Sequence, residues 1–244
     1  EIGSLKFTRE YLCVPISTGT ALFNPEFIEK CKNKEYVLKL GNRKDKGYRY
    51  YVGVDPAIST DGDYNVITVL EVDDEQNKAI VHVDRAKNIE FRENIEKIRL
   101  IGKVFEPEEI LFETNTFAKA FTQELKSMTD LNIRDFNTTR KNKQEIILNL
   151  QMNIENQKII MPYGDNASRR LTGALVEELS MFSITANGKF EGVGAHDDLV
   201  MSLALANAAS QGTGNQFILL DDLDIFDEPT TTRRSVPGVL GMNF

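Results

Sequence analysis

The stretch from Leu199 to Ala209 constrains the fold more than any other segment of this chain. It reads LVMSLALANAA, and its apolar residues cover every side of a helix rather than one stripe. A helix of that kind has to be enclosed by other elements on all sides. Directly before it stand a histidine and two aspartates, His196, Asp197 and Asp198. Two adjacent negative charges at the start of a buried helix need a physical explanation.

The chain is long enough to build a core around that helix. It has 244 residues, of which 41% are hydrophobic and 27% charged, as in ordinary globular proteins. Its longest apolar stretches fall short of the roughly 18 residues of a membrane span, so we expect no membrane association. Cys13 and Cys31 form no CxxC motif. The sequence therefore predicts neither a zinc site nor a disulfide, and indicates a reducing, cytoplasmic setting.

Charge is distributed unevenly along the chain. The net charge of −8 argues mildly against nucleic acid as a partner, because phosphate-binding proteins usually carry a basic surface. However, residues 39–49 contain five basic groups and one acid, and residues 138–143 contain three basic groups and no acid. Residues 221–228 hold five acids. The total is therefore a poor guide to any one face.

The order of predicted elements is that of an α/β fold. Three β-rich segments on short connections, 48–55, 66–72 and 79–86, predict an antiparallel meander. Helical and extended patterns then alternate, and Asn187-Gly188 marks a hairpin before the last helix. The later segments are a helix at 91–105, a strand at 108–115, a helix at 116–128, a strand at 131–138, helices at 143–157 and 167–182, and a hairpin at 182–193. This order predicts a ribonuclease H-like mixed sheet with flanking helices and a C-terminal hairpin.

Acidic residues stand where such a sheet brings its functional ends together. Asp55 ends the first strand, Glu113 ends the strand ILFE, and Asp197 and Asp198 start the last helix. Each has a plainer explanation: a turn at Asp-Pro, a cap for the helix after Glu113, and a favourable interaction between the aspartates and the helix dipole. His196 by itself fits a capping or hydrogen-bonding residue better than a ligand.

Taken together with the strand order, the same acids point to a metal site. Carboxylates that converge on one point repel each other unless cations lie among them. Oxygen-only ligands favour hard ions, Mg²⁺ or Mn²⁺ rather than zinc. Two such ions can activate water and stabilise the leaving oxygen in phosphodiester hydrolysis.

The motifs resemble the nuclease domain of the large terminase subunit of tailed bacteriophages. The resemblance rests on HDDLVMSLALA together with VGVDPA, DGDYN and ILFETN. The flanks agree, since FTREYLC and ALFNPEFIE are similar to the segment that follows the ATPase domain in that family. TTRKNKQEIILNLQMNIENQKIIMP is similar to the family's lysine-bearing helix. The resemblance covers about residues 7–210 of the chain.

Carried over residue by residue, the resemblance implies catalytic, metal-binding acids at Asp55, Glu113 and one of the last two aspartates. We favour Asp198 as the ligand and expect Asp197 to support it or cap the helix, because successive helical residues point about 100° apart. We expect Asp55 to bridge two Mg²⁺ or Mn²⁺ ions, with Glu113 and Asp198 each holding one. One ion would generate the attacking hydroxide and the other would stabilise the departing 3′ oxygen.

Further positions bear on this implied site. Asp63, in DGDYN, matches a recurrent acid of the family, and His196 is an additional candidate ligand. Met201 stands where many relatives carry an aspartate, which leaves the site one carboxylate poorer and affects the second ion most. Asp197, Asp63 and His196 are therefore candidate metal ligands besides the main three.

The implied substrate is double-stranded DNA, cut with little sequence specificity from concatemeric viral genomes during packaging into capsids. Arg140, Lys141 and Lys143 would hold the DNA backbone, and the basic residues at 43–49 either join them or form a solvated loop. The hairpin at 183–193 either guides a strand towards the site or closes the sheet edge. The acidic balance predicts weak DNA affinity for this part alone.

The chain contains no G-x-x-x-x-G-K-[ST] motif, so it carries no ATP-driven motor. We expect residues 1–47 to be a connector that follows an ATPase domain absent from this chain. Residues 48–210 would form the nuclease domain and residues 211–244 an acidic, flexible tail. The resemblance implies the ATPase domain, the portal and the small terminase subunit as partners, and the host cytoplasm as the location.

Two other functions fit the same sequence. A Holliday-junction resolvase of this fold would share the acids but select branched DNA. A non-catalytic DNA- or portal-docking module would use the tail at 221–244 as its binding element. An actin-like or sugar-kinase ATPase is disfavoured, because no Gly-rich phosphate loop accompanies the first strand.

Overall fold

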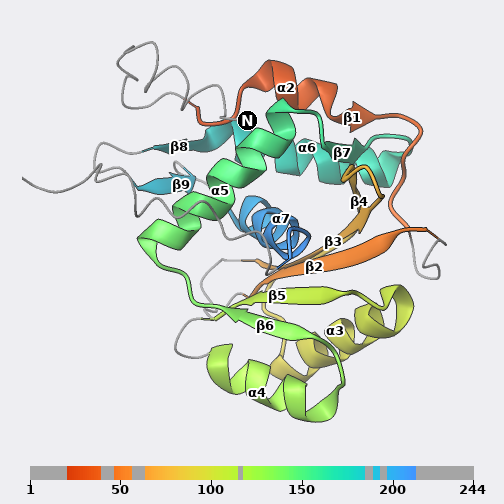
Figure 1. Ribbon diagram of the computed structural model, residues 1–244, viewed down its shortest axis with the longest axis vertical. Coiled ribbons are helices and arrows are strands. Elements are labelled where there is room, and N and C mark those ends of the chain that lie inside the picture. The colour runs from red at the N-terminus through yellow and green to blue at the C-terminus, as the bar shows by residue number, and fades with distance from the viewer. Residues whose placement is uncertain are drawn as a thin grey trace, which may run out of the picture. The chain divides into compact units, whose positions relative to one another are not determined.

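The computed structural model describes residues 21–39, 47–56, 64–114, 118–184, 189–192 and 197–212 (Figure 1). The chain divides into two compact units, Glu1–Gly212 and Thr213–Phe244. The second unit, which holds most of the predicted tail, lies outside the described residues. The description that follows concerns the first unit alone. None of its described helices is long and apolar enough to cross a bilayer.

The predicted antiparallel meander forms the centre of a seven-stranded sheet. It consists of β2 (Arg49–Asp55), β3 (Asn65–Val72) and β4 (Lys78–Ala86). β2 and β4 both pair with β3 in antiparallel register, so that Asp55 lies opposite Val66. β3 is buried along its whole length, which suits its β-branched sequence.

Two parallel strands extend the sheet beyond β2. They are β5 (Glu109–Glu113) and β6 (Ile133–Phe136), as the alternating pattern predicted. Parallel neighbours require crossover connections, and α3 (Phe91–Phe105) and α4 (Ala118–Met128) supply them. Both helices bury apolar residues in one core with the same face of the sheet.

The opposite edge of the sheet contains two strands that the sequence did not predict. β7 (Ile159–Pro162) lies parallel to β4, and β1 (Lys32–Asn33) lies parallel to β7. The sheet order is therefore β1-β7-β4-β3-β2-β5-β6. β1 has only two residues, too few to show a period, and the four residues of β7 end on a proline.

The predicted connector includes a short helix, as expected, and it also adds to the sheet. α2 (Pro25–Lys30) begins after Asn24, whose side chain accepts a hydrogen bond from the Glu26 amide at 2.9 Å. β1 follows directly, so the segment at 21–39 packs in the same unit as the sheet.

The other face of the sheet is covered by α7 (Asp198–Ala209), with α5 (Arg140–Glu155) and α6 (Asn166–Met181) packed against it (Figure 1). Every residue of α7 is buried, which confirms the prediction of an enclosed helix. The strand beneath it makes room through Gly53.

Gly53 permits direct contact between the backbones of β2 and α7. A Cβ atom at Gly53 would lie 2.1 Å from the carbonyl oxygen of Ser202 and 2.4 Å from the backbone nitrogen of Ala206. The Ser202 hydroxyl also donates a hydrogen bond to the Gly53 carbonyl at 2.9 Å. The position of α7 on the sheet is therefore fixed close to the end of β2.

The predicted hairpin is present as β8 (Phe182–Ile184) and β9 (Phe190–Gly192). Its expected turn at Asn187-Gly188 lies outside the described residues. Ala21 adds an antiparallel bridge to Ser183, so the start of the described chain lies beside this hairpin.

Candidate functional site

Two acidic residues meet where β2 and β5 end. The strands are parallel neighbours with Val54 opposite Phe112, so Asp55 and Glu113 are adjacent last residues. The Glu113 side chain raises the pKa of Asp55, through its charge and through hydrogen bonding. The strand register therefore brings together two predicted site residues that are far apart in sequence.

The surroundings of Asp55 oppose its negative charge. Burial raises the pKa of Asp55 well above its usual range, and the charge and hydrogen bond of Glu113 raise it further. The charges of Asp198 and Asp197 act in the same direction. Three other acids thus act on Asp55 at the end of β2. This is the electrostatic situation that a bound cation relieves.

Asp198 and Asp197 differ in their partners. Asp198 is the first residue of α7 and 9% exposed, and its carboxylate accepts a hydrogen bond from the Tyr64 amide at 3.1 Å. The Asp197 carboxylate lies 3.0 Å from the Lys143 ammonium group and makes no side-chain capping bond to the helix. Of the two roles expected for Asp197, capping by its side chain is therefore wrong, because the ion pair directs the carboxylate towards α5; the supporting role stays a prediction.

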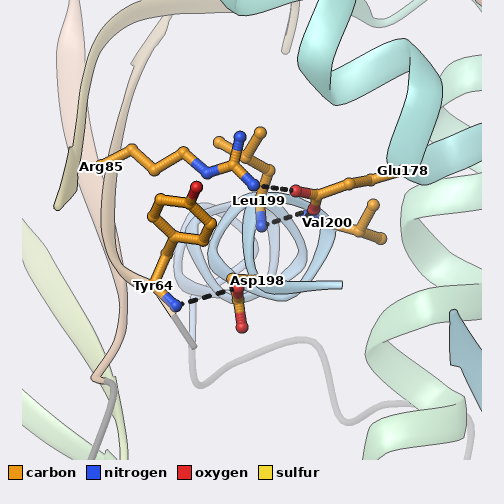
Figure 2. Close-up of polar contacts among 6 residues, drawn as sticks. All are labelled: Tyr64, Arg85, Glu178, Asp198, Leu199 and Val200. Carbon is orange, nitrogen blue, oxygen red and sulfur yellow. Dashed lines mark hydrogen bonds and ion pairs between the residues drawn. The ribbon is translucent and has the colours of Figure 1, made fainter. Parts of the chain in front are cut away.

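The cap of α7 is a residue that the sequence analysis missed. Glu178, on α6, accepts hydrogen bonds from the amides of Leu199 at 2.8 Å and Val200 at 3.4 Å (Figure 2). Its other oxygen accepts a hydrogen bond from Arg85 at 2.7 Å. Burial raises the pKa of Glu178 to about 7, against the opposing influence of Arg85 and the two amides.

A sequence signal for Glu178 did exist. The buried residues of α6 follow a helical stripe, and Glu178 occupies a position in it between Leu175 and Leu179. An acid on the inward stripe of an amphipathic helix requires a buried partner. The period alone does not reveal that the partner is the start of another helix.

The predicted DNA-binding residues lie at the start of α5. Thr139 forms a capping box with Asn142, which fixes the first turn. Arg140 and Lys141 are exposed in that turn, whereas Lys143 reaches across to Asp197. The start of α5 is therefore joined directly to the residue before α7.

Several predicted residues fall outside the part of the chain that the structure describes. They are Asp63, His196 and the basic residues at 43–46. Arg49 is described, and its guanidinium lies 3.9 Å from the Asp74 carboxylate, at the end of β2 opposite to Asp55.

The chemistry of the described acids fits a hard divalent cation. Asp55, Glu113 and Asp198 offer carboxylate oxygens, which Mg²⁺ and Mn²⁺ prefer. Within the described part of the chain, no three acidic, histidine or cysteine side chains are grouped closely enough to surround one ion. What links these acids is therefore their charge, since the carboxylates of Glu113, Asp198 and Asp197 all raise the pKa of Asp55.

Solved structures of phage terminase nucleases share this fold. The large terminase nuclease from thermophilic phage G20c is 22% identical, with a TM-score of 0.61 over 78% of this chain and 98% of that chain. The same nuclease with bound magnesium is 21% identical, with a TM-score of 0.61 over 80% and 98%. The HK97 bacteriophage large terminase is 10% identical, with a TM-score of 0.56 over 79% of this chain and 44% of that chain. At these identities the likeness establishes the fold.

Sequence comparison gives the family. No curated protein sequence matches the chain. The family model described as the terminase RNaseH-like domain matches residues 52–209, from β2 to the last residue of α7. That match spans more than half of the chain and includes Asp55, Glu113 and Asp198. The chain therefore belongs to the terminase RNaseH-like domain family, as its motifs predicted.

Proposed function

We propose that this chain is the nuclease part of a large terminase, a divalent-metal-dependent endonuclease that hydrolyses double-stranded DNA. It would cut concatemeric viral genomes, with little sequence specificity, during packaging into capsids. The observation that carries this proposal is the shared influence of Glu113 and Asp198 on Asp55, where β2, β5 and α7 meet. Membership of the terminase family and the magnesium-bound relative support it.

Each proposed ligand has a defined place in the fold. Asp55 is influenced by acids from two other elements, which suits a ligand shared by two Mg²⁺ or Mn²⁺ ions. Glu113 and Asp198 would each hold one of them. Bound cations supply Lewis acidity, which lowers the pKa of a water molecule and neutralises charge on the phosphate. The chain itself contributes backbone positions that are fixed by a strand pair and a buried helix.

Asp197, Asp63 and His196 are proposed to assist. Asp197 is already paired with Lys143 in the described structure, so its charge is partly compensated. Its part in the proposed site is therefore to orient Lys143 rather than to bind an ion directly.

The start of α5 is the proposed contact with the DNA backbone. Arg140, Lys141 and Lys143 would bind phosphates without reading bases. The proposal includes a motor ATPase domain, the portal and the small terminase subunit as partners, since the isolated acidic chain would bind DNA weakly. It also includes the predicted connector at 1–47, the tail at 211–244, and action in the host cytoplasm.

Plasmid cleavage tests the proposal. Wild-type protein with Mn²⁺ should convert supercoiled DNA to nicked and linear forms, and EDTA should prevent this. Asp55→Asn should reduce the rate by at least about 100-fold, as is usual when a group that stabilises transition-state charge is lost. The control is Asp74→Asn, whose side chain is 95% exposed and which should cut like wild type.

Three outcomes would change the assignment. Equal cutting by Asp55→Asn and wild type would place the chemistry elsewhere. Strong preference for a four-way junction over linear duplex would indicate a resolvase. Absence of both cleavage and thermal stabilisation with Mn²⁺ or Mg²⁺ would indicate a docking module.

A further inference from the structure

The buried start of α7 has an unusual cap. A helix leaves its first four backbone N–H groups without partners inside the helix, and these are costly to bury unpaired. In many helices the side chain of the preceding residue accepts a hydrogen bond from one of them. Here Asp197 holds that position but pairs with Lys143. Glu178, from the neighbouring helix α6, accepts from the Leu199 and Val200 amides instead.

Glu178 also belongs to a closed set of contacts around Asp198, which Figure 2 shows. Its second carboxylate oxygen is 2.7 Å from the Arg85 guanidinium. That guanidinium stacks over the Tyr64 ring at 3.9 Å from the centroid. The amide of Tyr64 in turn donates to the Asp198 carboxylate at 3.1 Å. Asp198 is therefore held through its side chain by Tyr64 and through the next two backbone amides by Glu178.

In this arrangement Glu178 caps α7, and Asp198 is left to interact with the acids at the end of β2. A carboxylate in the first turn of a helix is attracted to the helix's own free amides. Because Glu178 accepts from those amides, the Asp198 carboxylate does not have to turn back onto them. It can face the acids at the end of β2, whose charges already act on Asp55.

We propose that Glu178 is a positioning residue for the cation site, which caps α7 from α6 and thereby leaves Asp198 to act as a ligand. Arg85 supports the same arrangement, since it pairs with Glu178 and stacks on Tyr64, whose amide binds Asp198. The inference depends on the proposed function, in which Asp198 holds a cation. It assigns to Glu178 no contact with the ion or the DNA.

Mn²⁺ binding to the purified chain, measured by calorimetry well below the melting temperature, tests the role. Glu178→Gln keeps an oxygen that can cap α7 but gives up the ion pair with Arg85, whereas Glu178→Ala gives up both. We expect Mn²⁺ affinity to fall by about 10-fold in Glu178→Gln, the lower end for loss of a group that supports a metal ligand, and further in Glu178→Ala. Cleavage by Glu178→Gln should recover most of its kcat at saturating Mn²⁺.

Glu177→Gln is the matched control. Glu177 is the exposed neighbour on the same helix, so this variant removes the same charge without touching α7. It should bind Mn²⁺ like wild type. If Glu178→Gln lowers the melting temperature but leaves Mn²⁺ affinity unchanged, the role is structural and the inference is wrong.

The variant Asp198→Asn shows whether a negative result for Glu178 overturns only the inference about Glu178 or also the proposed function. If wild type binds Mn²⁺ and Asp198→Asn does not, the cation site stands and Glu178→Gln alone decides the inference. If wild type neither binds Mn²⁺ nor cuts DNA, the proposed function and the inference both fall. If Asp198→Asn binds as well as wild type, Asp198 is not a ligand and Glu178 has no ligand to position.

Discussion

Asp197 and Asp198 are adjacent in sequence but have different environments. Lys143 compensates the charge of Asp197 at 3.0 Å, and the Asp197 side chain is 27% exposed. Asp198 is nearly enclosed, and its carboxylate accepts a hydrogen bond from a neutral backbone amide, Tyr64 N–H. A carboxylate that is more deeply buried has given up more of its hydration, so it has more to gain from a metal ion.

We therefore expect Asp198→Ala to lose much more Mn²⁺ affinity than Asp197→Ala. The loss in Asp197→Ala should stay within about 10-fold, as for a supporting group, whereas Asp198→Ala should exceed about 100-fold. Calorimetry on both variants under the same conditions gives the comparison, and each serves as the control for the other. The reverse ranking would make Asp197 the ligand and Lys143 its competitor for the ion.

At the scale of single residues, the sequence was a good guide to position and a poor guide to partners. Asp55 and Glu113 were expected to meet because both end strands, and the parallel register places them side by side. Asp197 was expected either to support Asp198 or to cap α7; its side chain makes no capping bond and pairs with Lys143, from a helix that starts more than fifty residues earlier. Glu178 was missed, because a helical period predicts burial but not the group on the other side.

At the scale of elements, Gly53 is the most demanding position in the sheet. Gly53→Ala should lower the free energy of unfolding by about 3 kcal/mol or more, the upper end for overpacking, because its Cβ would meet the α7 backbone and not a flexible side chain. Urea denaturation followed by circular dichroism measures the change.

Gly173→Ala is the corresponding control. Gly173 lies inside α6, and a Cβ there would meet no atom within 4 Å. Alanine is the better helix former, so this variant should gain about 0.5–1 kcal/mol. If the Gly53 and Gly173 variants unfold at equal urea concentrations, the packing of α7 on the sheet does not depend on the close approach of its backbone to β2.

The elements with a clear period were predicted from the sequence, and so were the short strands β5, β6, β8 and β9, whereas β7 and β1 were not. The meander, α3 to α6, and the buried α7 all appear where their patterns indicated. β7 and β1 were missed, because β7 owes its structure to pairing with β4, and β1 to pairing with β7, rather than to a pattern of their own. Pairing with a neighbouring strand is a tertiary effect that local sequence does not encode.

At the scale of the whole molecule, the net charge of −8 opposes the approach of DNA. DNA binding then depends on a few basic side chains, and the first turn of α5 provides two exposed ones, Arg140 and Lys141. The charge of the complete chain and that of the proposed contact surface therefore have opposite signs.

Replacing Arg140 and Lys141 with glutamine should weaken duplex binding for all sequences alike. The slope of log K against log salt concentration should decrease in magnitude by about 2, because two phosphates would no longer be neutralised by the protein. Fluorescence anisotropy without divalent cations measures this while preventing cleavage. Arg99 and Lys103, on α3, give a charge-matched control on the other face of the sheet. If that control changes the slope equally, binding follows net charge and not the start of α5.

The contact at Gly53 has a consequence for ion selection. If Asp55 and Asp198 hold cations as proposed, two main chains in direct contact set the spacing between their Cα atoms, and side-chain rotamers adjust it only slightly. A rigid spacing favours one ionic radius, and Mg²⁺ binds oxygen at about 2.0–2.1 Å whereas Ca²⁺ requires about 2.3–2.6 Å. Gly53, which touches neither ion nor DNA, would then limit the range of ionic radii that the proposed site accepts.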